Sequence, residues 1–315
     1  MAAKIAVVGD INQDFVMRAE RMPRPGETRT ADDLNFVPGG KGANQAVVAA
    51  RLGAEATMIG AVGDDPFGPQ LVANLERDGV CTDHVIHVEG VTSGYAFIAL
   101  APSGENSILR VMGAALHCTP ELVDSAADAI AEADVLLVQL GVSIETVLRA
   151  MQIADEAATA VVFDPAPVCD GLEGMWPLTT IATPNEMEAW DITGIEVTDL
   201  ASAAAAAAWL GEHGVATGMV TLGAEGCVIA DEDGARLVRG YEIEVVDTTG
   251  AGDAFAGALG VRTAEGAPMD EAAAFANAAG AISASKFGAQ PSLPYRDEVE
   301  ELMAEQERPE RVQHL

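Results

Sequence analysis

The residues with the clearest chemical potential lie in one short stretch, Val246–Ala256, which reads VDTTGAGDAFA. Gly250 and Gly252 bracket Ala251 in a predicted tight turn, and Asp253 follows at once, before a run of good helix formers. Backbone N–H groups at a helix N-terminus lack intrahelical partners and lie at the positive end of the helix dipole, so they can hold phosphate oxygens. An anion cradle beside a carboxylate suits phosphoryl transfer to a small molecule, although ordinary turn chemistry explains the same pattern.

A second glycine-rich segment, residues 39–45, reads GGKGANQ and opens a predicted helix. Glycine lets the backbone approach a ligand closely, and Asn44 in the first helical turn can hydrogen-bond hydroxyl groups. Lys41 is one of three lysines in the chain. Its place between glycines therefore favours a ligand contact.

Polar residues also follow two predicted strands. Asn12 and Asp14 come just beyond the apolar run 5–8, where open α/β sheets bind ligands, and turn chemistry is the equal alternative. Asn185 and Glu188 follow a strand and Pro184, which marks a helix N-terminus. Three positions apart, they would share one helical face and could reach a hydrated Mg²⁺ together.

The elements that position these residues follow from hydrophobic periodicity. From residue 120 onward, strand-like and helix-like segments alternate, which predicts a doubly wound α/β domain. Earlier, residues 15–38 and a hairpin around Gly104 form two β excursions. We expect them to pair into a lid, contributed by about 13–38 and 92–112, that excludes water from the site. Without a repeat or linker, residues 1–315 are expected to form one domain.

Three local expectations are less central. Residues 120–133 predict a single helix, the tail beyond Met303 is expected to be solvated, and His84 and His87 are interpreted as surface loop and not as a metal site. The cysteines are far apart in the sequence, which favours scattered reduced thiols; they are Cys81, Cys118, Cys169 and Cys227.

Composition narrows the function classes. An apolar fraction of 49% in 315 residues supports a packed core. Seventeen basic against 49 acidic residues give a net charge of −32, which disfavours nucleic acid and anionic membranes as partners. The carboxylates are spread along the chain, which favours adaptation to high salt over an acidic tail for a cationic partner. The first strand begins almost at once without a signal peptide, so a cytoplasmic location is expected.

The segments GGKGANQA and DTTGAGDAF, in this order, resemble the ribokinase (PfkB) family of carbohydrate kinases, and the resemblance runs through Gln290-Pro291-Ser292. It implies a mostly parallel, doubly wound sheet flanked by helices, with a small β-sheet lid. It also implies ATP-dependent transfer of the γ-phosphate to a terminal sugar hydroxyl, with D-ribose as the first expectation. Lid sheets in this family often pair, so a homodimer through the lid is expected.

The resemblance further implies roles for individual residues. Asp253 would be the catalytic base, beside an anion hole formed by Gly250, Ala251 and Gly252. The sugar hydroxyls would meet Asn12, Asp14, Gly40, Lys41, Asn44 and Asp253. ATP would meet Asn185, Thr221, Gly223, Gly250, Gly252 and Asn277. Mg²⁺ would be organised through water by Asn185 and Glu188. A monovalent cation, K⁺ first, would be held at Asp247, Thr249, Ser283, Lys286, Gly288 and Ser292.

One departure concerns the substrate. Ribokinases commonly place a Glu after the strand that ends Val138-Gln139-Leu140, and this chain has Gly141. Another pentose, a ketohexose, a keto-deoxy sugar acid and a nucleoside therefore stay open as substrates. A non-catalytic sugar- or nucleotide-binding regulator is an alternative class. A dinucleotide-binding oxidoreductase is disfavoured because GDINQD, without GxGxxG, follows the first strand.

Overall fold

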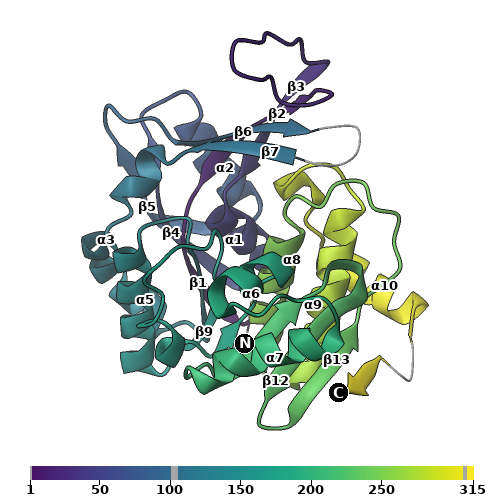
Figure 1. Cartoon of the computed structure of the whole chain (residues 1–315). Coiled ribbons are helices and arrows are strands. Elements are labelled where there is room, and N and C mark those ends of the chain that lie inside the picture. Colours follow the sequence, from purple (N-terminus) through teal and green to yellow (C-terminus); the bar gives the residue numbers. More distant parts are fainter. Residues whose placement is uncertain (1, 101–105, 308–310) are drawn as a thin grey trace.

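The computed structural model describes residues 2–100, 106–307 and 311–315. Within them, ten strands form one sheet that is parallel from β5 to β11 and antiparallel beyond (Figure 1). The strands in spatial order are β14 (Val312–His314), β13 (Gly234–Arg239), β12 (Gly226–Asp231), β11 (Thr217–Thr221), β10 (Ile181–Ala182), β9 (Ala160–Asp164), β8 (Val135–Gln139), β1 (Lys4–Val8), β4 (Glu55–Gly63) and β5 (Cys81–Val88). The predicted doubly wound, mostly parallel sheet is confirmed.

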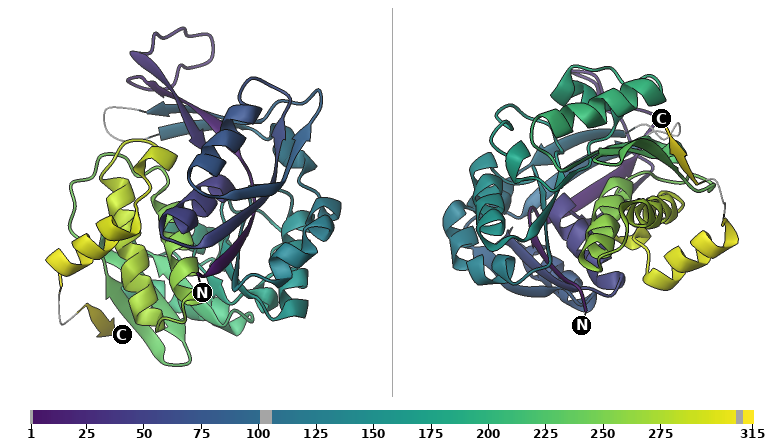
Figure 2. Two further views of the ribbon diagram at one scale, coloured as in Figure 1. Left: turned by 180° about the vertical axis from the view of Figure 1, so that it is seen from behind. Right: turned by 90° about the horizontal axis from the view of Figure 1, so that it is seen from below.

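Helices cover both faces of this sheet because its central strands are apolar on both sides (Figure 2). In β1, Ile5 and Val7 pack into one core cluster, while Ala6 and Val8 pack into the other. The helices on the first face are α1 (Lys41–Arg51), α2 (Gly68–Arg77), α8 (Ala251–Ala264), α9 (Met269–Ala284) and α10 (Arg296–Glu305). Those on the second face are α3 (Pro120–Ser125), α4 (Ala127–Ala131), α5 (Ile144–Ala157), α6 (Glu186–Thr193) and α7 (Leu200–Glu212).

The two β excursions pair, as expected, into a four-stranded sheet that we call the small sheet. It stands beyond the carboxyl ends of the central strands, at the top of Figure 1. Its strands in order are β3 (Asp33–Gly39), β2 (Asn12–Arg18), β6 (Gly94–Leu100) and β7 (Asn106–Val111). β2 and β6 run parallel, with Asn12 opposite Gly94. Gly104, expected at the hairpin turn, lies outside the described residues.

The two faces of the small sheet differ in burial. Val16, Val37 and Ile98 point inward and pack with Ala289. On the opposite face, one row of register partners crosses all four strands, and it is made of Phe36, Phe15, Phe97 and Leu109. Phe36 and Leu109 are 56% and 63% exposed. The small sheet therefore carries an apolar row on its outer face.

Two local expectations are wrong. The single helix over 120–133 is two short helices, because Ala126 leaves helical geometry at φ −106° and ψ 15° and is buried in the core. His84 and His87 lie on edge strand β5 and not in a loop; at i, i+3 their side chains point to opposite faces. The described residues beyond Met303 are all exposed or half-buried, as expected, although β14 among them forms an edge strand beside β13 that the sequence did not predict.

None of the helices in the described residues is both long enough and apolar enough to span a bilayer. The alanine-rich α7, the most uniformly apolar by sequence, has 13 residues.

Candidate active site

The turn GAG lies where the sequence predicts an anion cradle. Gly250 is the N-cap of α8 and adopts φ +83°, a left-handed conformation that favours glycine. Helix α8 begins at Ala251, so Ala251, Gly252 and Asp253 form its first turn. A Cβ added to Gly252 would meet no atom within 4 Å. Ala251 N donates to Thr248 O at 3.2 Å, whereas the Gly252 N–H borders open space and has no hydrogen-bond partner among the described residues, so it can receive an anion.

Asp253, 6% exposed, is held by two residues of α1. Asn44 donates from Nδ2 to Asp253 Oδ2 at 2.7 Å, and Lys41 Nζ lies 3.7 Å from Asp253 Oδ1. No donor in the described structure hydrogen-bonds Oδ1. Burial raises the pKa of Asp253 to about 6, with Asp164 adding to the rise and Lys41 opposing it. The geometry presents one buried, unpartnered carboxylate oxygen to an incoming hydroxyl.

Asp164 anchors this group, and the sequence patterns did not predict it. It ends β9 and accepts from Lys41 Nζ at 3.0 Å and from Gln45 Nε2 at 3.1 Å. Burial opposes the charge of Lys41, but Asp164 and Asp253 hold the pKa of Lys41 above its usual value. A carboxylate that ends a parallel strand, at the edge where such sheets bind ligands, is the signal that could have found it.

The residues expected to hold sugar hydroxyls surround the same point. Asn12 and Asn44 are buried, and the Oδ1 of each has no hydrogen-bond donor among the described residues. Burial raises the pKa of Asp14 to about 7, and the negative charges of Asp10 and Asp253 add to the rise. Gly40 has φ +94°, and a Cβ there would come within 2.7 Å of Asp10 O. Unpartnered acceptors around Asp253 are suited to the O–H donors of a polyol.

Asn185 and Glu188 form a capping box, so they lie on the same side of the N-terminus of α6. Asn185 precedes α6 as its N-cap; its Oδ1 accepts from Glu188 N at 3.0 Å, and Glu188 Oε2 accepts from Asn185 N at 2.8 Å. Burial and the charge of Asp164 raise the pKa of Glu188 to about 7. Glu188 therefore belongs electrostatically to the Asp164–Asp253 site.

The residues expected at the nucleotide lie along the neighbouring strand ends. Thr221 ends β11 and bridges to Asn185, and Gly223 follows with φ +54°. Asn277 on α9 is 8% exposed and donates to Val238 O at 2.9 Å. Its amide nitrogen thus already has a partner.

The loops expected to hold a monovalent cation come together. Asp247 accepts from Thr249 N and Gly288 N, both at 3.0 Å. The hydroxyl oxygens of Ser283 and Ser292 lie 2.8 Å apart. The Lys286 side chain turns elsewhere and pairs with Glu298 on α10.

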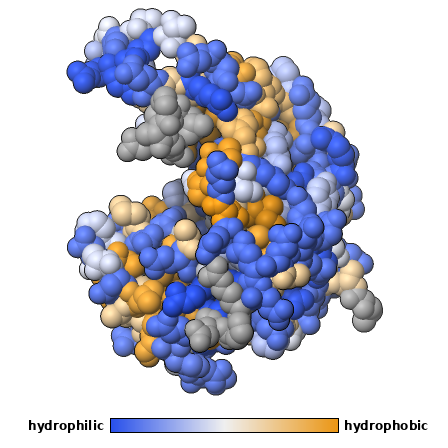
Figure 3. Space-filling model, turned by 90° about the vertical axis from the view of Figure 1, so that its right-hand side faces the viewer, coloured by the Kyte–Doolittle hydropathy of each residue, from blue (hydrophilic) through white to orange (hydrophobic). Residues whose placement is uncertain are grey.

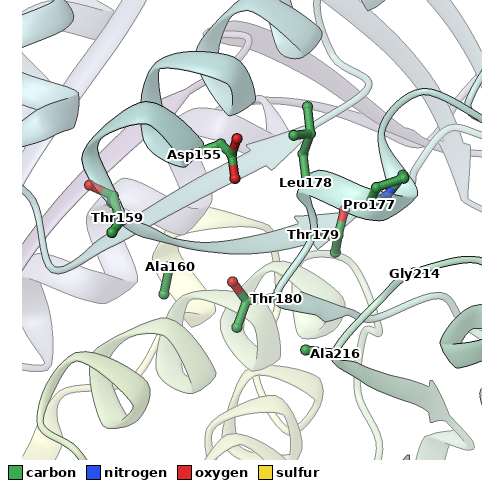
Figure 4. Close-up of a pocket in the computed structure, with 10 residues that line it drawn as sticks. Asp155, Thr159, Ala160, Pro177, Leu178, Thr179, Thr180, Gly214 and Ala216 are labelled. Carbon is green, nitrogen blue, oxygen red and sulfur yellow. The ribbon is translucent and has the colours of Figure 1, made fainter.

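The molecule is hollowed between the small sheet and the main body (Figure 3). A cavity of about 360 Å³ opens elsewhere, beside the amino-terminal starts of β9 and β10 (Figure 4). It is lined by Asp155, Ala158, Thr159, Ala160, Pro177, Leu178, Thr179, Thr180, Gly214 and Ala216. None of the predicted site residues lines this cavity, and it lies at the strand ends opposite to those that bind ligands in such sheets.

The doubly wound sheet, with the open N-terminus of α8 beside the buried Asp253, fits the class of α/β phosphotransferases that act on a hydroxyl group. The sequence matches the family described as pfkB family carbohydrate kinase over residues 2–296, and the chain belongs to this family.

Relatives and solved structures agree with this assignment. The ribokinase of Haemophilus influenzae is 40% identical over 96% of this chain and 99% of its own length, and that of Mus musculus is 36% identical over 95% and 94%. The structure of Arabidopsis thaliana ribokinase complexed with ribose and ATP superimposes with a TM-score of 0.89 at 31% identity, covering 96% and 99% of the two chains. A deoxyribokinase of Salmonella typhi is 33% identical over 95% of this chain and 98% of its own.

Proposed function

We propose that this protein is an ATP-dependent sugar kinase that converts D-ribose to ribose 5-phosphate. The observation that carries the proposal is the buried Oδ1 of Asp253, which no described donor hydrogen-bonds, beside the open helix start at Gly252. The similarity to a ribokinase that binds ribose and ATP supports ribose as the acceptor. Deoxyribose, another pentose, a ketohexose, a sugar acid or a nucleoside would be the alternatives.

The proposed mechanism follows from where the site residues lie. The sugar would lie beneath the small sheet with its terminal hydroxyl against Asp253 Oδ1 and its other hydroxyls against Asn12, Asp14 and Asn44. Asp253 orients this hydroxyl and accepts its proton, while the amides of the Gly250–Gly252 turn neutralise charge on the transferred group. Phosphoryl-transfer transition states are loose, so positioning and charge neutralisation supply most of the acceleration.

Mg²⁺ fits the acidic edge formed by Glu188 and Asp164, since it prefers carboxylate oxygens and retains its waters. Bound with ATP, the ion would neutralise phosphate charge. Asn185 would help to orient its water shell. The role of Glu188 here extends beyond its capping bond.

We further propose a K⁺ site between the 247–249 and 283–292 loops. The support is that Asp247, a buried carboxylate, joins both loops through backbone N–H groups and lies just before the anion cradle. A cation there would fix Gly250–Gly252. K⁺ should raise kcat above the value measured with a large organic cation at equal ionic strength.

We also propose a homodimer in which small sheets meet through the row Phe36, Phe15, Phe97 and Leu109. The support is the 56% and 63% exposure of its two ends, Phe36 and Leu109, which persists although Phe67 packs against Phe15 and Phe36. A third proposal is that the protein is adapted to high salt. Its net charge of −32 supports this proposal.

The test of the proposed function is ADP release over a panel of pentoses, hexoses, keto-deoxy sugar acids and nucleosides, with MgATP in high KCl. Ribose should give the highest kcat/KM, and phosphorus NMR should identify ribose 5-phosphate. A higher kcat/KM for a nucleoside or a sugar acid would overturn ribose as the substrate. High salt is used so that folding does not limit the assay.

A further inference from the structure

The sugar side of the site contains a carboxylate that the family resemblance does not assign. Asp10 follows β1 and is 2% exposed. Its Oδ1 accepts from Gly42 N at 3.2 Å, and its Oδ2 accepts from Asn12 Nδ2 at 2.7 Å. Arg110 Nη2 also donates to Oδ2, at 2.8 Å. A carboxylate offers about four lone-pair positions, so Asp10 retains capacity for one more donor.

Arg110 is carried by β7 and reaches from the small sheet to the main sheet. Its Nη2 donates to Gly141 O at 2.7 Å as well as to Asp10. In the register of the small sheet, Arg110 lies opposite Ala96, which lies opposite Asp14. Arg110 and Asp14 therefore share the face that looks toward Asp253. One guanidinium thus links the small sheet to the ends of β1 and β8.

The same contacts explain why residue 141 is glycine. A Cβ added to Gly141 would lie 2.2 Å from Asp10 Oδ1, closer than real atoms approach. The Asp10 carboxylate thus fills the space in which a side chain at 141 would start. A carboxylate on residue 10 and one on residue 141 exclude each other in this pocket.

We propose that Asp10, held by Arg110, is the specificity-determining carboxylate of the sugar pocket and accepts a substrate hydroxyl in place of a side chain at position 141. This inference rests on the proposed function and deepens it. Asp14 and Asp253 lie near enough to sense the charge of Asp10. With these three acidic residues around it, the pocket selects neutral polyols and disfavours sugar acids.

The first test is Asp10→Asn, which keeps the shape of the side chain and removes its charge. KM and kcat are measured for ribose, 2-deoxyribose and a keto-deoxy sugar acid, together with KM for ATP, in high KCl. The KM for ribose should rise at least about tenfold, as expected for loss of a hydrogen bond to a charged group, while KM for ATP stays within about twofold. An unchanged KM for ribose would overturn the inference.

The matched control is Asp33→Asn. Asp33 also pairs with an arginine of the small sheet, Arg18, at 3.8 Å, but both side chains are exposed and lie outside the pocket. This variant should keep the wild-type KM for every sugar. A rise in KM equal to that of Asp10→Asn would assign the effect to general loss of charge on the small sheet and reject a specific role for Asp10.

The second test moves the carboxylate across the pocket. Asp10→Ser frees the space above residue 141, and the double variant Asp10→Ser with Gly141→Glu returns a carboxylate from the opposite side. Its KM for ribose should be at least about tenfold below that of Asp10→Ser alone. Relief of a steric clash cannot explain a lower KM in the double variant, because Asp10→Ser alone contains no clash to relieve. No gain would count against carboxylate recognition.

Arg110→Met covers the case in which Asp10 variants do not fold, since the Arg110 side chain is 25% exposed. It should raise KM for ribose and reduce the thermal shift caused by ribose, with the ATP-induced shift kept. If wild type converts ribose while Asp10→Asn and Arg110→Met both keep its KM, the inference alone fails. If wild type converts no neutral sugar, the proposed function fails and the inference falls with it.

Discussion

At the scale of residues, the site concentrates buried carboxylates in a small volume. The pKa values of Asp14 and Glu188 rise to about 7 and that of Asp253 to about 6, in each case mainly through burial. Burial of an ionised carboxylate costs folding free energy, and the lysine and asparagine of α1 offset only part of it. These buried carboxylates therefore lower the stability of the fold, and in return they are placed to accept hydrogen bonds from hydroxyl groups.

Asp14→Asn should stabilise the protein at pH 8. The pKa of Asp14 is raised from 3.8 to about 7, so its stabilising contribution is present below pH 3.8 and is lost as the pH rises through 7. The amide removes this penalty, which is on the order of 4 kcal/mol for a rise of about three pKa units. Thermal melting from pH 5 to pH 8 measures it: the advantage should grow with pH while ribose turnover falls. An advantage that shrinks with pH would contradict this assignment.

The kcat/KM for ribose should decrease at acidic pH. Asp253 must be ionised to accept a proton, and its carboxylate form predominates above a pKa of about 6. A plot of kcat/KM for ribose against pH should therefore fall below about pH 6 in the free enzyme. Asp14 titrates nearby and broadens the fall. A profile that is flat down to pH 5 would show that none of these groups acts as the base.

Sequence patterns identified the chemistry of individual residues better than their contacts. Asp253, Lys41 and Asn44 come together as expected because two glycine-rich turns open two neighbouring helices, α1 and α8. Asp10 and Arg110 were missed, since their roles depend on a contact between β1 and a strand of the small sheet that no local spacing encodes.

At the scale of elements, the small sheet stands beyond the carboxyl ends of the central strands and carries the proposed dimer interface. Its inward face packs on Ala289, and its outward face bears the apolar row. The two excursions were predictable from their period-two pattern and turn residues, and so was their pairing. The break at Ala126 was not, because alanine is a good helix former and tertiary packing overrides its propensity.

Leu109→Lys should convert the proposed dimer to monomer. Leu109 is 63% exposed at one end of the apolar row, and a charge there would have to be desolvated at the interface. Sedimentation velocity in high KCl measures the shift in mass. Ile108→Lys is the matched control, because Ile108 is 57% exposed on the same strand but on the opposite face. Equal masses for wild type and Leu109→Lys would reject this interface.

At the scale of the whole molecule, the net charge of −32 acts on the fold as self-repulsion. The acidic residues were visible in the sequence, and so was their spread. The tail was not predictable: β14 is a three-residue strand whose pairing with β13 depends on the sheet edge being free. Short edge strands carry too little periodicity to be recognised from sequence.

Raising KCl from 0.2 M to 2 M should increase the melting temperature by about 5 °C or more. At molar salt the Debye length falls to about 3 Å, so repulsion between surface carboxylates is screened. Differential scanning calorimetry measures the shift. NaCl at the same concentration should raise the melting temperature by about the same amount. This comparison separates general screening of surface charge from binding at the proposed K⁺ site. A melting temperature independent of salt would contradict adaptation to high salt.

The most direct test of the central claim is the turnover of Asp253→Asn with ribose and MgATP. Asparagine keeps the size and the Asn44 neighbour of the native side chain but cannot accept the hydroxyl proton. We predict that kcat falls by about 10²- to 10⁴-fold, while the Kd for ATP, measured by calorimetry, stays within about twofold. Turnover within about tenfold of wild type would show that Asp253 is not the base and that the account of the site is wrong.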